Sequence, residues 1–397
     1  MPHQLNNHRN ESNPLDALQA VIAREQKAFI NEKTGRKKIG YLCNYAPLEL
    51  FSAAGVRHIR LFKAGDPHTV NLGERFTQSV FCDFSKSCLG GFSGGDPLYK
   101  AIDKVYTVHT CNTVKRITEI IDQFVPVKLL SLPKLRDLPS SRHFYYKELV
   151  DLKNDLEKLT GNIITEEAIH EKIVLYNKLR QVLKKISELR KWAHPPITGG
   201  QYLDLVKAYY YLEPEQALKL YERLYTKLAE TPVRRGDFLR IMVAGSIVAD
   251  DDRRLLDLVE GELGARVVVE AHCTGVRPFL HTVSESGDPL RALAHGYLDQ
   301  APCAKMKPLS DSSENAGKLA LDYNVDGVLY VYLKFCVCYG IGTKEFITHF
   351  QKLGLPALEI SSDYSQSDHG QLKTRIEAFI EVLNERKENP DEQYISA

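Results

Sequence analysis

Residues 38–62 read KIGYLCNYAPLELFSAAGVRHIRLF, and this stretch decides the expected fold. Short apolar runs at 38–42 and 56–62 have the length and composition of strands. Between them, apolar residues recur at helical spacing over 48–54, and Gly55 follows, where a glycine commonly ends a helix. The strand–helix–strand order predicts a parallel sheet, because parallel neighbours are usually joined by a helical crossover.

The same alternation continues beyond this stretch and returns in the last third of the chain. We expect further strands at 103–110 and 127–132 around a helix at 113–124. The last third predicts strands at 238–244, 265–271, 326–335 and 356–361, with helices at 253–263, 313–323, 344–353 and 371–383. The first and last thirds of the chain match in their main strand–helix–strand units. The expected fold class is therefore α/β, with two flavodoxin-like, doubly wound parallel-sheet domains and a ligand cleft between them.

The middle of the chain has a different pattern, which predicts an all-helical segment between the two domains. It is rich in Leu, Lys, Glu and Tyr at a 3.6-residue period, with helices expected at 145–159, 165–191, 201–211 and 214–229. The expected domains are a tail and helix at 1–35, with 1–14 as a loose tail, a first α/β domain at 36–138, the helical segment at 139–235, and a second α/β domain at 236–397.

The charge balance and composition exclude several classes of protein. The 397 residues include 52 Lys+Arg and 51 Asp+Glu, a net charge of +1, which argues against a main role in binding nucleic acid. Hydrophobic residues make up 43% of the chain, as in a globular protein, but no apolar run is long enough to span a membrane. The polar N-terminus lacks the apolar core of a secretory signal, so we expect a cytoplasmic protein with reduced cysteines.

Four of the eight cysteines follow expected strands: Cys43, Cys111, Cys273 and Cys336. The carboxyl ends of parallel strands are where open α/β sheets bind ligands, so these thiols are expected to face one cleft. Cys82 and Cys303 lie in loops rich in Gly or Pro nearby. A single cysteine in such a place is more often a small buried apolar residue, but the shared edge favours a common site.

The spacing of the cysteines favours a multi-iron cluster over other thiol sites. Zinc sites usually contain local C-x₂₋₄-C pairs, whereas this chain has C-x-C at 336–338 and C-x₅-C at 82–88. A redox C-x-x-C is also absent from the sequence. Separated single thiolates suit an iron–sulfur cluster assembled by the fold. The glycine-rich run at 90–95 lacks the Gly-Lys-Ser/Thr of a phosphate loop, so we interpret it as a flexible surface turn and do not expect this chain to bind ATP.

Several motifs, in order along residues 36–385, resemble the 2-hydroxyacyl-CoA dehydratase and benzoyl-CoA reductase family. They are GYLCNYAPLEL at 40–50 with AAG at 53–55, CDFSKS at 82–87, HTCN at 109–112, CTG at 273–275, PC at 302–303, DGV at 326–328 leading to KFC at 334–336, and a terminal block with DYS at 363–365, GQ at 370–371, Arg375 and EAF at 377–379. Any one of these motifs is weak, but the ordered set is fairly specific.

The resemblance implies two flavodoxin-like lobes with a helical part, in subunits that pair as homo- or heterodimers. It also implies an iron–sulfur cluster between the lobes on three cysteines, which match Cys82, Cys111 and Cys336. In this family a separate iron–sulfur ATPase supplies single electrons at low potential. Dehydratases use these electrons on an acyl-CoA thioester, and benzoyl-CoA reductases use them to reduce an aromatic ring.

One branch of the family, the double-cubane cluster proteins, consists of homodimeric ATP-dependent reductases with an [8Fe-9S] cluster on six cysteines. Cys43, Cys273 and Cys303 match the three additional ligands, so we expect an oxygen-sensitive reductase of a small molecule, most like this branch. The alternatives are a dehydratase or benzoyl-CoA reductase subunit with a [4Fe-4S] cluster and an acyl-CoA substrate, and a non-catalytic electron-transfer or scaffold subunit. Asn112 and Val337 depart from the acidic residues frequent at these family positions, and Cys88 and Cys338 look like extra cysteines.

Candidate proton donors are His109 and His272, each within two residues of an expected ligand, and the loop at 363–369. The alternative for each histidine is a hydrogen-bonded residue without a catalytic role. The Lys- and Glu-rich helices of 145–191 are expected to present a solvated face, and this face is also the candidate docking surface for the ATPase.

Overall fold

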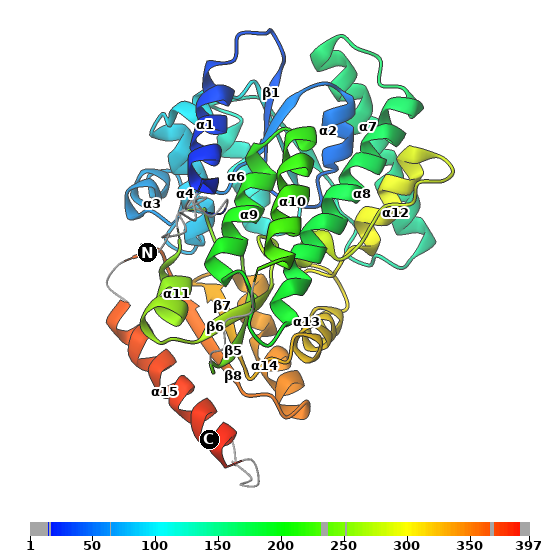
Figure 1. Cartoon of the computed structure of the whole chain (residues 1–397). Helices are drawn as coiled ribbons and strands as arrows, with labels where there is room; N and C mark the ends of the chain where they lie inside the picture. Colours follow the sequence, from blue (N-terminus) through cyan, green and yellow to red (C-terminus); the bar gives the residue numbers. More distant parts are fainter. Residues whose placement is uncertain are drawn as a thin grey trace, which may run out of the picture.

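A computed structural model describes residues 15, 17–63, 65–231, 237–250, 252–365 and 369–389, so the tail expected at 1–14 lies outside the described residues. It confirms the α/β fold class: the chain forms two four-stranded, fully parallel sheets, one in each lobe (Figure 1). The strands are β1 (Lys38–Tyr41), β2 (Arg57–Arg60), β3 (Lys104–Val108), β4 (Val127–Leu130), β5 (Arg240–Gly245), β6 (Arg266–Ala271), β7 (Gly327–Leu333) and β8 (Ala357–Ser362).

The two sheets have the same topology. Their orders are β2-β1-β3-β4 and β6-β5-β7-β8, so in each lobe the first strand of the chain lies inside the sheet and the second lies at its edge. This order follows the flavodoxin-like pattern, in which the chain direction across the sheet reverses beside the first strand. The reversals lie between β1 and β3 in the first lobe and between β5 and β7 in the second.

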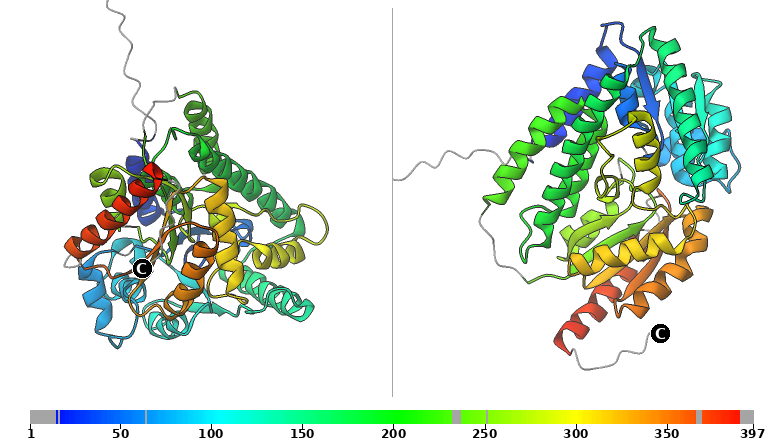
Figure 2. Two further views of the ribbon diagram at one scale, coloured as in Figure 1. Left: turned by 90° about the horizontal axis from the view of Figure 1, so that it is seen from below. Right: turned by 90° about the vertical axis from the view of Figure 1, so that its right-hand side faces the viewer.

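Helices cover both lobes and form the segment between them (Figure 2). Those of the first lobe are α1 (Leu18–Asn31), α2 (Leu48–Ala53), α3 (Pro67–Glu74), α4 (Asp83–Ser93), α5 (Pro97–Lys100) and α6 (Asn112–Ile121). The helical segment contains α7 (Pro139–Thr160), α8 (Glu166–Glu188), the short η1 (Leu189–Lys191), α9 (Gly199–Tyr211) and α10 (Pro214–Ala229). After β5 the chain forms α11 (Arg254–Leu256), η2 (Asp257–Glu262), η3 (Arg277–Phe279), α12 (Pro289–Asp299), α13 (Ser310–Asp322), α14 (Val337–Lys352) and α15 (His369–Glu388). Of these, α12 packs against α7 and α8 of the helical segment.

The helix expected at 253–263 is one α-helical turn that widens into a π-helical turn. Leu263 N–H donates to the carbonyl oxygen of Leu258, five residues earlier, and this bond ends η2. Such wide turns insert one residue relative to an α-helix. The hydrophobic periodicity places the helix correctly but cannot distinguish these two turn types.

Helix α9 connects the two lobes through its packing. It contacts β2 and β6, the edge strands of the two sheets, and nearly all of its residues are buried. At its start, a Cβ on Gly199 would lie 2.6 Å from Cβ of Val267 in β6, so only a glycine allows this close approach. The helical segment is therefore part of the contact between the lobes.

Two buried ion pairs attach α8 and η1 to the sheets and their helices. Arg180 in α8 pairs with Glu49 in α2, and both side chains are buried. Arg190 in η1 makes a two-bond contact with Glu270 in β6, with N–O distances of 2.5 and 2.9 Å. Buried charges are stable only when paired in this way, so the two pairs fix the segment against both lobes.

The expectation of a flexible surface turn at 90–95 is wrong. Gly90 and Gly91 belong to α4, which is buried along most of its length and packs against α3, while Gly94 and Gly95 end this helix. A Cβ on Gly90 would lie 1.9 Å from the carbonyl oxygen of Thr69 in α3. The glycines therefore allow two helices to approach closely, a use of glycine that turn statistics do not reveal.

We expect Gly90→Ala to destabilise the chain by about 1–3 kcal/mol, because the added methyl overlaps backbone atoms that cannot move without shifting α3. Gly370→Ala is the matched control, since Gly370 lies in the first turn of α15 with open space around it. Urea unfolding of both variants measures the difference. Equal unfolding free energies would contradict the proposed close packing.

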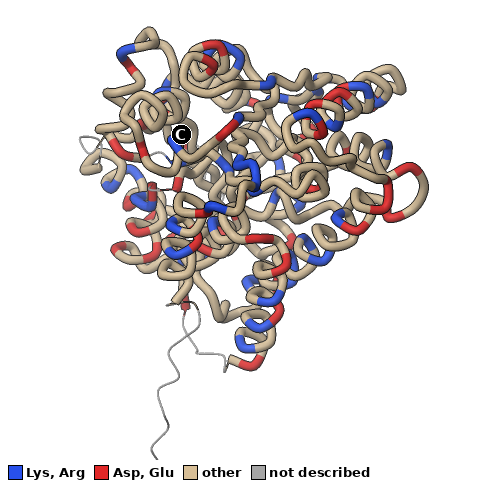
Figure 3. Tube along the Cα trace, turned by 90° about the horizontal axis from the view of Figure 1, so that it is seen from above, with Lys and Arg blue, Asp and Glu red and all other residues tan. Residues whose placement is uncertain are grey.

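Figure 3 shows Lys and Arg interspersed with Asp and Glu along the Cα trace. Within the described ranges, no helix combines the length and apolar character that a bilayer-spanning segment requires.

Candidate functional site

A cavity of about 400 Å³ lies at the carboxyl ends of both sheets. Its wall contains residues that follow β1, β3, β5, β6 and β7, so both lobes contribute to it. In open α/β sheets, ligands bind at the carboxyl ends of the strands where the strand order reverses. The cavity thus lies where the topology of both sheets favours ligand binding.

The six cysteines expected to be ligands all line this cavity: Cys43, Cys82, Cys111, Cys273, Cys303 and Cys336. Four of them follow strands, whereas Cys82 directly precedes α4 and Cys303 lies in the loop before α13. All eight cysteines of the chain are free thiols. The structure therefore brings the six together, and their role as cluster ligands stays a prediction.

The first thiol group consists of Cys82, Cys111 and Cys336, which interact electrostatically. Burial, together with the charges of the other two thiols, raises the pKa of Cys336 to about 11. Each of the three is the N-cap residue of a helix: Cys82 of α4, Cys111 of α6 and Cys336 of α14. Because the free N–H groups at a helix N-terminus favour negative charge, three helix dipoles favour an anionic group held at these sulfurs.

The second thiol group consists of Cys43, Cys273 and Cys303, and two arginines lie against it. Arg60 donates from Nη2 to the Cys273 sulfur at 3.0 Å and from Nη1 to the Cys273 carbonyl oxygen at 2.9 Å. Burial raises the pKa of Cys43, and the charges of Cys303 and Cys273 act in the same direction. Burial opposes ionisation of Cys303, but the positive charges of Arg277 and Lys305, together with a hydrogen bond from Tyr339, outweigh it and lower the pKa of this thiol.

Five cationic side chains line the cavity: Arg60, Lys134, Arg277, Lys305 and Lys307. No Asp or Glu lines it among the residues that the structure describes. Burial alone would lower the pKa of Lys305, but thiolates of both groups hold it well above the usual value. Lys305 therefore lies near both thiol groups. Arg277 is 7% exposed, and its Nε has no hydrogen-bond partner within the described chain. An unpartnered donor on a buried cation is costly, so this cavity favours an anionic occupant.

A single metal ion requires ligand side chains that lie closer together than those of the cavity. Across the described ranges, no three or more His, Cys, Asp or Glu side chains are spaced to hold one metal ion. The thiols of the two groups instead surround a space that is large compared with one ion.

The comparison with protein families decides the family of the chain. A model described as "2-hydroxyglutaryl-CoA dehydratase, D-component" matches residues 43–383. The chain belongs to this family. The resemblance found in the sequence motifs is thereby confirmed at the level of the family, whereas the double-cubane branch is not.

Three relatives of this chain carry names that point to acyl-CoA or dehydratase chemistry. The candidate dehydratase subunit YjiM of Escherichia coli is 29% identical over 89% of this chain and 93% of its own length. The lactoyl-CoA dehydratase beta subunit of Anaerotignum propionicum is 23% identical over 93% of this chain and 98% of its own length. A benzoyl-CoA reductase subunit of Thauera aromatica is 24% identical over 76% and 79% of the two chains. The chain is thus of the dehydratase and reductase type, and these three relatives are named as subunits of enzymes.

Neither histidine expected to donate protons lines the cavity. His272 is buried, its Nδ1 lies 3.0 Å from Oγ1 of Thr274, and burial lowers its pKa to about 3. Burial and the charge of Lys134 lower the pKa of His109, which is half-buried. In the loop at 363–369, Asp363 pairs with Lys334, while residues 366–368 lie outside the described residues. The proton-donor roles of these groups stay predictions.

The two cysteines expected to be extras lie in different surroundings. Cys338 lines the cavity and is hydrogen-bonded to Cys111, which lowers the pKa of Cys111 and raises that of Cys338. Cys88 is fully buried in α4, and its sulfur lies 3.8 Å from the carbonyl oxygen of Leu61. Cys88 therefore belongs to the core of the first lobe, whereas Cys338 belongs to the site.

The sequence analysis missed the cationic side of the site. Arg60 is the last residue of β2 and Lys134 follows β4, so both lie at the sheet edge that identified the cysteines. Lys134 donates to the carbonyl oxygens of His109 at 2.9 Å and Thr110 at 2.8 Å, which fixes the loop before Cys111. The strand-end rule could have found these two cations, but not Arg277, which begins η3, or Lys305, which lies in the loop between α12 and α13.

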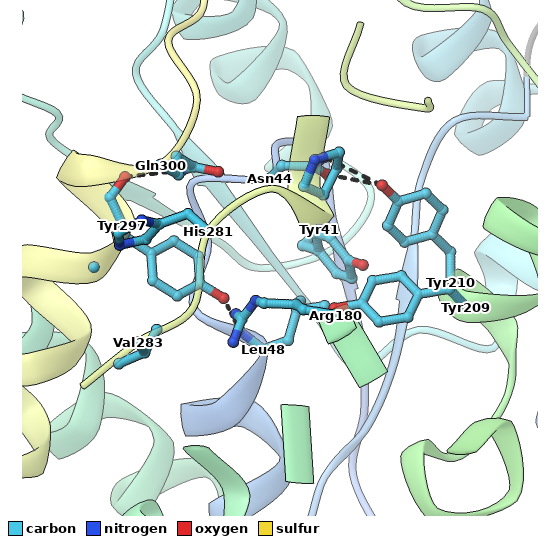
Figure 4. A pocket seen from close by; sticks show the side chains of 12 residues that line it. Tyr41, Asn44, Leu48, Arg180, Tyr209, Tyr210, His281, Val283, Tyr297 and Gln300 are labelled. Carbon is cyan, nitrogen blue, oxygen red and sulfur yellow. Dashed lines mark hydrogen bonds between the residues drawn. The ribbon is translucent and has the colours of Figure 1, made fainter. Parts of the chain in front are cut away.

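A smaller cavity of about 30 Å³ adjoins the site, and Figure 4 shows the side chains around it. Asn44 lines both cavities and donates to the Cys273 carbonyl oxygen at 2.6 Å. Around the small cavity, Tyr297 donates to Glu49 at 2.7 Å, and Glu49 pairs with Arg180. Asn44 also donates to the hydroxyl of Tyr210 at 3.1 Å, and these bonds support the loop that carries Cys43.

Proposed function

We propose that this chain is the cluster-holding subunit of an acyl-CoA dehydratase or aryl-CoA reductase, with an iron–sulfur cluster on the first thiol group. The observation that carries the proposal is the meeting of Cys82, Cys111 and Cys336, each at a helix N-terminus, in one cavity between the lobes. The family membership and the relatives named for lactoyl-CoA and benzoyl-CoA support a CoA thioester as substrate.

The residues of the cavity fit such a cluster. Thiolates are the ligands that iron–sulfur clusters require, and a cluster of several irons needs its thiolates further apart than one ion does. The cations around the thiols, with no carboxylate among the described lining residues, balance the negative charge of thiolate ligands. When bound, an iron–sulfur cluster supplies one-electron transfer to the substrate.

Other parts of the chain prepare the cavity for this chemistry. Arg60 holds the Cys273 loop in place, and Lys134 holds the loop before Cys111. Lys305 and Arg277 remain available to a carbonyl oxygen or an anionic group of the substrate. Apolar side chains such as Leu42, Phe84 and Leu333 line the same wall and exclude water.

The chain is proposed to work in a dimer and with a separate ATP-hydrolysing activator that supplies low-potential electrons. Several relatives are named as one subunit of a larger enzyme, which supports a dimer of this chain with a second, different subunit. The alternative is a dimer of two copies of this chain. A cytoplasmic location fits eight free thiols and an oxygen-sensitive cluster, because thiols stay reduced there.

The second thiol group favours a second candidate, a double-cubane reductase of a small molecule. Cys43, Cys273 and Cys303 line the same cavity, and Arg60 and Arg277 lie against them. Six thiols in two groups of three offer ligands for two linked cubanes. A non-catalytic electron-transfer subunit is the third alternative.

Iron and acid-labile sulfide determination on the strictly anaerobically purified chain tests these proposals. About four irons per chain are expected for one cubane, and about eight would favour the double cubane. An electron paramagnetic resonance spectrum of the reduced protein checks the assignment. A chain that contains iron but turns over no acyl-CoA or small molecule with activator and reductant would favour the electron-transfer alternative, and a chain without iron would exclude all cluster functions.

A further inference from the structure

The small cavity beside the site lies between the thiol-lined cavity and the surface. It shares Asn44 with the thiol-lined cavity. On its other side it shares His281, Val283 and Gly296 with a groove of about 530 Å³, which residues of the loop 281–288 and of α12 line. Most residues of that loop are exposed, so the groove opens to solvent. The groove, the small cavity and the thiol-lined cavity therefore lie in series.

The size and the wall of the small cavity suit water. One water molecule needs about 10–15 Å³ of such space, so the cavity of about 30 Å³ has room for about two and excludes a larger solute. Asn44, Arg180 and Gln300 contribute polar groups to the wall. A buried water is stable when it finds about two to four polar partners, and this wall offers several.

Tyr41 provides independent evidence for a polar occupant. Its side chain lines the small cavity and is 0% exposed, and its hydroxyl has no hydrogen-bond partner within the described chain. Figure 4 shows Tyr41 among the side chains around the cavity. A buried hydroxyl without a partner is costly, because it has lost its hydrogen bonds to the solvent on folding. A water molecule in the cavity would restore one of them.

The thiol-lined cavity needs a second way out for small molecules if the proposed function holds. A CoA thioester is far larger than water and would occupy the mouth of that cavity during the reaction. Helix α9 packs against the edge strands of both sheets, so it opposes a parting of the lobes. A dehydration releases one water for each substrate, made from the hydroxyl group of one carbon and a hydrogen of its neighbour.

We propose that the small cavity holds water and forms the inner part of a side route, by which water leaves the thiol-lined cavity for the groove beside α12. The route begins at Asn44 and ends at the wall that His281, Val283 and Gly296 form between the small cavity and the groove. Its role in releasing the product water rests on the proposed function. The water site does not, since it depends only on the size and polarity of the small cavity.

A crystal structure of the full chain tests the water site. We expect ordered water within hydrogen-bond distance of the Tyr41 hydroxyl, with a second polar partner in the wall. In solution, Tyr41→Phe should lower the midpoint of urea unfolding, because the variant loses the bond between the hydroxyl and this water. If the cavity is dry, the same change removes an unpartnered hydroxyl, and the midpoint should rise or stay the same. An empty cavity, or a midpoint that does not fall, would overturn the proposal.

His281→Phe tests the route, because an apolar ring at the outer wall narrows the passage and offers water no hydrogen bond. With activator and reductant, and with lactoyl-CoA as the probe, we expect kcat to fall severalfold while KM and the iron content stay unchanged. Gly296→Ala should act in the same direction, since its methyl group would lie 2.9 Å from Cγ2 of Val283.

Two control variants separate the route from general effects of substitution. His281→Gln keeps a polar side chain at the outer wall and should retain kcat. Gly317→Ala crowds a helix in a similar way, because its methyl group would lie 2.5 Å from Nε2 of His349. Gly317 belongs to α13 and lines neither the groove nor the two cavities, so this variant should also retain kcat.

The possible outcomes distinguish the two parts of the proposal. Ordered water together with an unchanged kcat in both His281→Phe and Gly296→Ala would support the water site and overturn the route. An equal fall of kcat in Gly317→Ala would show a loss of packing and would also overturn the route. If the unmodified chain contains iron but does not turn over the probe, the role in product release fails with the proposed function. The crystal structure and Tyr41→Phe decide the water site in either case.

Discussion

Cys336→Ala is expected to lose at least one whole cubane, a loss of about four irons per chain after anaerobic purification. The sulfur of Cys336 interacts with those of Cys82 and Cys111, so a cubane held by these three thiolates loses one of its ligands. The same result is expected for Cys82→Ala. Iron and sulfide content, together with the resonance spectrum of the reduced protein, measure the effect.

Two matched variants make this prediction specific. Cys88→Ala removes a buried thiol outside the cavity and should retain the iron content of the unmodified chain. Cys273→Ala removes a thiol of the second group, so it should retain about four irons if that group holds none, and should lose iron if the double cubane is present. A Cys336→Ala protein with unchanged iron would contradict the assignment of the first thiol group.

Arg190→Met is expected to destabilise the chain by about 3–5 kcal/mol, because it leaves the carboxylate of Glu270 buried without its partner. Arg190 is 0% and Glu270 3% exposed at the side chain, and two N–O contacts of 2.5 and 2.9 Å join them. The guanidinium also stacks on Tyr202 at 3.9 Å from the ring centroid. Unfolding of the cluster-free chain in urea, followed by circular dichroism, measures the loss.

Two further variants separate the buried charge from simple loss of packing. Arg116→Met removes an exposed arginine that pairs with Glu119, and should change stability by about 0–1 kcal/mol. Arg190→Met combined with Glu270→Leu removes both charges and should recover much of the loss. Burial already raises the pKa of Glu270, so the carboxyl of the single variant should take up a proton as the pH falls, and its instability should decrease. A loss that does not depend on pH would contradict the role assigned to the unpaired charge.

The alternation of strands and helices could be predicted from the sequence, because parallel sheets impose a simple local pattern. The runs at 38–42 and 326–335 became β1 and β7, and the cysteines after them lie at the carboxyl ends of these strands. The placement of Cys43 and Cys336 in one cavity follows from that edge rule. What the rule could not provide is the distance between thiols on different lobes.

The missed features depend on contacts between segments far apart in the chain. Arg277 interacts electrostatically with Cys303, and Lys305 with Cys43 and Cys111. The segments that carry these two cations have no periodic pattern that would predict the interactions. The interpretation of 90–95 as a surface turn failed for the same reason, since the closeness of α3 decides why Gly90 is a glycine. Local signals therefore predicted the elements, and tertiary contacts decided the charge of the site.

The position of α9 limits how the site can exchange its contents. This helix packs against an edge strand of each sheet and is buried along nearly its whole length. A clamshell motion that parts the lobes would strip this helix from one of the two edge strands and expose its apolar surface to water. Reactants should therefore enter a cleft of nearly constant width through its mouth, so that their size and shape limit access before any chemistry begins.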